Sequence, residues 1–168
     1  MRNTRLILSA SLACLALVAC GKSPGERAAE AAIERATGQK ANVDADTGEV
    51  TIEGKDGQSM RIAGGDSAKL PAAFPKDVYL PSDYKVLSVM EMPDAMVVQL
   101  DSPGTLAALA EASGKKMATE GWKQTLSMQQ AADQQVTMYE KDKRSATVSL
   151  VDDEAPGVKI NLQLAKQQ

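Results

Sequence analysis

The segment Val158-Lys159-Ile160-Asn161-Leu162-Gln163-Leu164 carries the clearest pattern in the chain. Apolar and polar residues alternate along it, so the four apolar side chains share one face of an extended strand and the polar ones share the other. A strand of this kind belongs to a sheet that is packed on one face and solvated on the other, as antiparallel sheets allow. The segment therefore predicts an antiparallel sheet with a core on one side.

Three more strands are expected before it, over 122–129, 135–141 and 146–151. Their alternation assigns one set of residues to the core face, namely Trp122, Leu126, Met128, Val136, Met138, Ala146, Val148 and Leu150. The opposite, solvated face would carry Lys123, Thr125, Ser127, Thr137, Tyr139, Lys141, Thr147 and Ser149. We interpret Lys123, Thr125, Thr137, Tyr139 and Lys141 as a possible binding face; the alternative is a plain solvated surface.

A helix is predicted over 102–120, ahead of these strands. Ser102 is expected to cap it, with Pro103 at the first helical position and Gly121 ending it. Its apolar stripe consists of Leu106, Leu109, Ala110, Ser113 and Met117. Trp122 would then contact Met117 just beyond the helix end.

Two further strands, 86–92 and 95–101, precede this helix and turn at Pro93 and Asp94. The resulting order, β-β-α-β-β-β-β, predicts an α+β domain over 82–168, with one helix on one face of an antiparallel sheet.

Residues 64–81 are expected to join this domain to the part before it. A flexible joint comes first, followed by a stiff extended segment, the strap, whose prolines are Pro71, Pro75 and Pro81. We expect Phe74 and Tyr79 of the strap to point inward.

A smaller unit is predicted over 25–63. Ser23, Pro24 and Glu26 form a capping-box helix start, and Gly38 ends that helix. Turn residues between β-favouring runs then predict a three-stranded meander over roughly 41–63. One short helix on a small sheet buries little apolar surface, so we interpret this unit as a satellite domain.

The chain begins with Arg2 and Arg5, an uncharged run from Leu6 to Ala19, and then Cys20. This is the layout of an export signal, and the run is too short to span a bilayer, which takes about 20 apolar residues. Leu17-Val18-Ala19-Cys20 resembles the lipobox of bacterial lipoproteins, which signal peptidase II cleaves. The pattern also leaves open an ordinary secretory signal, an uncleaved anchor, or acylation at Cys14, where Ser11 departs from the lipobox.

The lipobox resemblance implies a signal peptide over 1–19, cleavage between Ala19 and Cys20, and a tether over 20–24. Cys20 would carry diacylglycerol and an amide-linked acyl chain such as palmitate, and two signals of this kind hold a protein on a membrane stably. Asp directly after the cysteine favours the inner membrane in this family, whereas Gly21 and Lys22 stand here. We therefore expect the protein on the outer membrane, facing the periplasm.

The strap adds a second resemblance. Leu70-Pro71, followed by Phe74-Pro75-Lys76-Asp77-Val78, resembles a segment of uncharacterised bacterial lipoproteins in which a similar helix and meander come first. This resemblance implies no activity.

Composition excludes several classes of function. The 168 residues include no histidine and two cysteines, Cys14 and Cys20, and the formal net charge is −3. Cys14 is expected to leave with the signal peptide and Cys20 to be acylated, so the mature chain would have neither an imidazole nor a free thiol. Zinc sites and Ser/His or Cys/His catalysis are therefore disfavoured, and we predict no metal and no cofactor. Without clustered Lys and Arg, we also expect no nucleic-acid partner.

These observations favour a non-enzymatic, membrane-anchored module that binds another envelope protein or assists envelope assembly. An inhibitor or immunity lipoprotein directed against a toxin is a special case of it. The sequence also leaves open a carboxylate-based envelope hydrolase or ligand carrier, and a purely structural lipoprotein.

Overall fold

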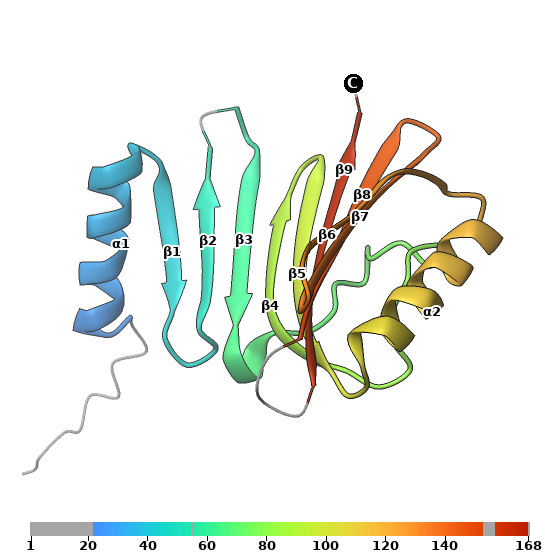
Figure 1. The fold of residues 1–168 in the computed structure, drawn as a ribbon. Helices are drawn as coiled ribbons and strands as arrows, with labels where there is room; N and C mark the ends of the chain where they lie inside the picture. Colours follow the sequence, from blue (N-terminus) through green and yellow to red (C-terminus); the bar gives the residue numbers. More distant parts are fainter. Residues whose placement is uncertain (1–21, 55, 153–156, 168) are drawn as a thin grey trace, which may run out of the picture.

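The computed structural model describes residues 22–54, 56–152 and 157–167. These residues form one antiparallel sheet of nine strands, with one helix beside its edge and a second helix on one face (Figure 1). The predicted α+β class is confirmed. The expected signal peptide over 1–19, its cleavage site at Ala19 and the expected acylation site Cys20 all lie outside the described residues.

The strand order is β1-β2-β3-β4-β5-β9-β8-β7-β6. The elements are α1 (Pro24–Thr37), β1 (Lys40–Asp44), β2 (Glu49–Glu53), β3 (Ser59–Gly64), a 3-10 turn η1 (Gly65–Ser67), β4 (Lys85–Met92), β5 (Ala95–Ser102), α2 (Leu106–Thr119), β6 (Lys123–Ala131), β7 (Gln134–Lys141), β8 (Arg144–Asp152) and β9 (Val158–Lys166).

Strand β3 pairs with β4 over four residue pairs, from Arg61 opposite Glu91 to Gly64 opposite Ser88. The predicted meander is therefore not a sheet of its own, because its three strands extend the larger sheet. Burial is nevertheless uneven along this sheet. Helix α1 has no buried residue, and among the described apolar residues before η1 only Ile52 and Ala63 are buried.

Helix α1 begins and ends as predicted. The Ser23 hydroxyl accepts a hydrogen bond from the Glu26 N–H, and the Glu26 carboxylate accepts one from the Ser23 N–H. Gly38 lies in the left-handed region at φ 69° and donates its N–H to the Glu34 carbonyl. Both ends are thus closed by local groups, as the capping rules require.

Three glutamates of α1 cover the free edge of β1. Their carboxylates accept hydrogen bonds from backbone N–H groups of β1 and the residue after it: Glu26 from Ala45 at 2.9 Å, Glu30 from Val43 at 2.8 Å and Glu34 from Ala41 at 3.3 Å. Glutamates four positions apart are about 6 Å apart along the helix axis, and alternate residues of a strand are roughly 6.8 Å apart. Because these spacings are similar, successive glutamates reach alternate N–H groups along the β1 edge. This glutamate ladder occupies the groups that an added strand would bind.

Helix α2 starts later than predicted. Thr105, not Ser102, is its N-cap, and the Thr105 hydroxyl accepts from the Ala108 N–H. Ser102 is instead the buried last residue of β5, where its hydroxyl donates to the Asp83 carbonyl at 2.8 Å. A cap at Ser102 was wrong because pairing with β9 keeps this residue in the sheet.

The end of α2 is as predicted. Gly121 has φ 81°, and the Trp122 N–H donates to the Met117 carbonyl at 2.9 Å. This is the long hydrogen bond of a Schellman motif, and it brings Trp122 back against the end of the helix. Both Met117 and Trp122 are buried.

Helix α2 and the strap lie against the same face of the sheet, here called the core face (Figure 1). Phe74 and Tyr79 of the strap are buried, which confirms their predicted direction. They join a cluster with Leu100, Ile160 and Leu162 of the central strands. The opposite side of the sheet is called the outer face below.

Candidate functional site

The structure divides the predicted binding face. Thr137 and Tyr139 are only 6% and 3% exposed, so their assignment to a solvated face was wrong. The turn Asp142–Lys143, with both φ values positive, pairs Lys141 with Arg144 and hence Tyr139 with Ala146. Residues directly opposite each other share a face, and Ala146 belongs to the core. Recognising this two-residue turn in the sequence would have shown which residues of β7 face the core.

The other three residues of that predicted face lie apart. Lys123 and Thr125 are exposed on β6. The Lys141 ammonium donates to Asp77 Oδ2 at 2.8 Å and to the Glu120 carbonyl at 2.6 Å. Lys141 is therefore part of the fastening between the strap and the sheet.

Four apolar residues predicted for the core lie on the outer face instead: Leu126, Met128, Val136 and Met138. Leu126, Met128 and Met138 are 42%, 43% and 39% exposed. Leu126 lies opposite Met138, and Met128 lies opposite the half-buried Val136, so the four side chains form one patch across β6 and β7. We call these four side chains the β6–β7 patch. Its exposure and the burial of Tyr139 have the same cause, because the core and outer faces of β7 are the reverse of those predicted.

Strand β6 is the last strand of the sheet at the edge opposite β1. All nine of its residues are exposed, and within the described chain no strand pairs with its outer side. Lys123 is its one charged residue. Edge strands are commonly blunted by charges or covering elements, so β6 contrasts with β1 and its glutamate ladder.

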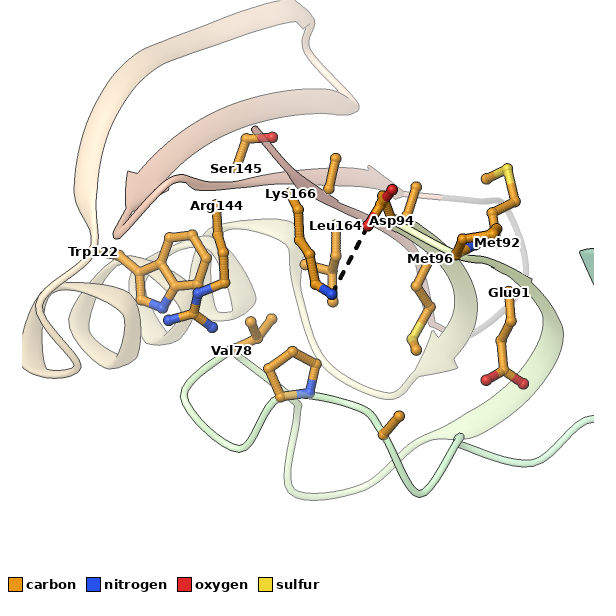
Figure 2. Close-up of a pocket in the computed structure, with 15 residues that line it drawn as sticks. Val78, Glu91, Met92, Asp94, Met96, Trp122, Arg144, Ser145, Leu164 and Lys166 are labelled. Carbon is orange, nitrogen blue, oxygen red and sulfur yellow. Dashed lines mark ion pairs between the residues drawn. The ribbon is translucent and has the colours of Figure 1, made fainter. Parts of the chain in front are cut away.

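A pocket of about 260 Å³ opens between the strap and one end of the sheet (Figure 2). The sheet end is formed by the end of β4, the start of β5, the start of β8 and the end of β9. Val78 and Pro75 line it from the strap, and Met96 and Leu164 line it from the sheet. The pocket was missed in the sequence because its lining residues come from segments far apart in the chain.

One wall of the pocket is held by Asp77 of the strap. Its carboxylate accepts two hydrogen bonds from Arg144, at 3.0 and 2.7 Å, and its carbonyl accepts one from the Trp122 indole N–H at 2.8 Å. The Arg144 guanidinium lies 4.9 Å from the centre of the Trp122 ring, a cation–π contact. Hydrogen bonds from Arg144 and Lys141 hold the pKa of Asp77 far below its usual value.

The opposite wall carries a looser set of charges. Lys166 Nζ lies 3.9 Å from Asp94 Oδ1, and these side chains are 70% and 68% exposed. Glu91 is held more closely, because Arg61 donates to it at 2.6 Å. Both acids of the pocket are thus engaged by cations, an arrangement unlike a pair of free carboxylates set up for hydrolysis.

No family model, curated protein or solved structure matches this chain. Among the described residues, no helix is both long and apolar enough to cross a membrane. The same part of the chain contains no group of three or more acidic, histidine or cysteine side chains placed to hold a metal ion.

Proposed function

We propose that this protein is a lipoprotein of the bacterial cell envelope that binds another envelope protein and catalyses no reaction. Acyl chains on Cys20 would hold it on the outer membrane, facing the periplasm. The support for the anchor is the order of residues in Leu17-Val18-Ala19-Cys20, after a basic start and an uncharged run. The support for protein binding comes from the sheet.

The observation that carries the binding proposal is the contrast between the two sheet edges. The N–H groups at the β1 edge are occupied by the glutamate ladder, whereas β6 has no strand on its outer side among the described residues. An extended segment of a partner can add to such an edge through main-chain hydrogen bonds. The adjacent β6–β7 patch would add apolar contact to that pairing.

The position of the anchor agrees with this use of β6. Helix α1 begins at Pro24, four positions after Cys20, so an acylated cysteine would lie within about 14 Å of the start of α1. Helix α1 is at the β1 edge, and β6 is the strand furthest from β1 in the sheet order. The open edge would thus be the part of the sheet most distant from the acylated end.

Mass spectrometry of the protein isolated from membranes tests the anchor. We expect a mature chain that begins at Cys20 with acyl chains attached, and a Cys20→Ser variant that keeps residues 1–19. Detection of an unmodified Cys20, or of the first nineteen residues on the native protein, would overturn this part of the proposal.

Crosslinking in living cells tests the binding edge. A photoreactive residue at Ser127 of β6 should give a crosslink to one defined envelope protein, whereas the same residue at Glu111 of α2 should give none. The double variant Leu126→Lys, Met128→Lys should abolish that crosslink. Its matched control adds the same charge at exposed positions of α2, Ala112→Lys and Ala118→Lys. Equal crosslinking in both double variants would contradict the proposal.

The inhibitor or immunity function is a second form of the same proposal, in which the bound partner is a toxin. It would use the same open edge, so the identity of the crosslinked protein separates the two. A secreted toxin encoded by a neighbouring gene would favour it, and an envelope-assembly operon would favour the first form.

A further inference from the structure

The pocket between the strap and the sheet has an apolar interior. Val78 and Leu164 are 2% and 9% exposed, Met96 is half-buried, and Trp122, at 5%, stands at one end (Figure 2). Ligand pockets in proteins typically have about 300–1,000 Å³. At about 260 Å³, this pocket suits a ligand smaller than most cofactors.

The strap wall of the pocket is held in place before any ligand arrives. Asp77 binds Arg144 with both carboxylate oxygens and accepts from Trp122 with its carbonyl. The Tyr79 N–H also contacts the Met117 sulfur of α2 at 3.4 Å. A wall fixed in this way does not have to be ordered by the ligand, which lowers the entropic cost of binding.

The charges around the pocket differ in how firmly they are held. Arg144 is engaged by Asp77, and Glu91 is engaged by Arg61. Among the described residues, the Lys166 ammonium pairs only with Asp94, at 3.9 Å, and an exposed pair of this kind contributes little. Figure 2 shows the Lys166 side chain reaching from β9 toward the strap, into the space between Val78 and Met96.

From this arrangement we infer that the pocket binds a small monocarboxylate with an apolar body, of which octanoate is a suitable probe. The apolar chain lies among Val78, Met96 and Leu164, where burial of each methylene favours binding. The carboxylate meets the Lys166 ammonium and displaces Asp94 from it. This site is separate from the β6 edge and does not depend on the proposed partner.

Trp122 provides a direct readout, because it is the only tryptophan of the chain and lines the pocket. The full chain is reconstituted in phosphatidylcholine vesicles and titrated with octanoate, octanol and octyltrimethylammonium, which differ in the charge of the head group. We expect a saturable change in Trp122 fluorescence with octanoate, a weaker response to octanol and the weakest to the cation. A stronger response to the cation, or no saturable response to octanoate, would overturn the inference.

Matched variants at two exposed positions test the charge assignment. Lys166→Gln should weaken octanoate binding about threefold to fivefold, the range of an exposed ion pair, and should leave octanol binding unchanged. Asp94→Asn should strengthen octanoate binding, because it removes the competing carboxylate. Equal octanoate affinity in both variants and the parent would contradict the role of Lys166.

A third variant tests the location. Ala73 lines the pocket from the strap and is exposed, so Ala73→Phe should fill the pocket while the fold is kept. The expected result is loss of the octanoate response with an unchanged thermal unfolding curve. Because thermal unfolding is measured on the same sample, a folding defect is recognised separately. Unchanged octanoate affinity in this folded variant would place the ligand elsewhere and overturn the inference.

Discussion

Asp77 binds the guanidinium of Arg144 through both carboxylate oxygens, across 67 positions of the chain. Lys141 donates to the same carboxylate, and Trp122 donates to the carbonyl of the same residue. A segment without regular secondary structure is thereby fastened to the β7–β8 hairpin and to the end of α2. The fastening closes the core on one side and forms a wall of the pocket on the other.

Asp77→Asn should lower the free energy of unfolding by about 1–3 kcal/mol, because it weakens charge-assisted hydrogen bonds to two cations at a partly buried site. Asp83→Asn is the control, since Asp83 is exposed in the same segment. Urea unfolding at neutral pH measures both. The prediction is wrong if the two variants are equally stable.

The stabilisation by Asp77 should depend on pH in a defined direction. Its folded-state pKa is lowered by Arg144 and Lys141, so it stabilises the protein above the unfolded-state pKa of about 3.9 and progressively less below it. The stability difference between the parent and Asp77→Asn should be full at pH 7 and shrink below about pH 4. Unfolding midpoints of both proteins at several pH values test this; a constant difference would contradict it.

Removal of the glutamate ladder should open the β1 edge. In the triple variant Glu26→Ala, Glu30→Ala, Glu34→Ala, three backbone N–H groups lose their acceptors, so their amide hydrogens should exchange at least about tenfold faster. Sedimentation velocity should also detect self-association through the exposed edge. Glu111→Ala on α2 is the control. Unchanged exchange at Ala41, Val43 and Ala45 would show that the ladder does not protect this edge.

Truncation on the two faces of β7 should destabilise the protein by very different amounts. Tyr139→Ala should cost about 3–5 kcal/mol, as expected when a buried aromatic side chain is removed from a core. Met138→Ala, one position away on the outer face, should cost less than about 1 kcal/mol. Thermal or urea unfolding measures both, and similar losses in the two variants would mean that the observed register of β7 is wrong.

Two glycines near α2 should behave oppositely. Gly114 lies inside the helix, and beyond its chain neighbours and the adjacent helix backbone no atom is within 4 Å of an added Cβ, so Gly114→Ala should stabilise by about 0.5–1 kcal/mol. Gly121 has φ 81°, where a Cβ is disfavoured, so Gly121→Ala should destabilise by about 1–2 kcal/mol. Shifts of the unfolding midpoint in the same direction would contradict this pair of predictions.

Local features were predictable because they depend on neighbouring residues alone. The capping box at Ser23, the glycine ends of both helices and the alternation of β9 follow from short-range hydrogen bonding and side-chain period. The start of α2 was misplaced because pairing between strands, which short patterns do not report, keeps Ser102 in β5. Tyr139 was assigned to the wrong face because the turn between β7 and β8 determines which residues of β7 face the core.

The α+β class, the order of the elements, the buried direction of the strap aromatics and the expectation of an acylated Cys20 all follow from the residue pattern. Three further features depend on how the chain packs: the meander extends the main sheet, one sheet edge is covered while the other is open, and the strap and four strand ends form a pocket. The two groups differ in the distance along the chain over which their interactions act. Caps and alternation arise within a few residues, whereas edges, pockets and ion pairs such as Asp77 with Arg144 exist only after distant segments have packed together.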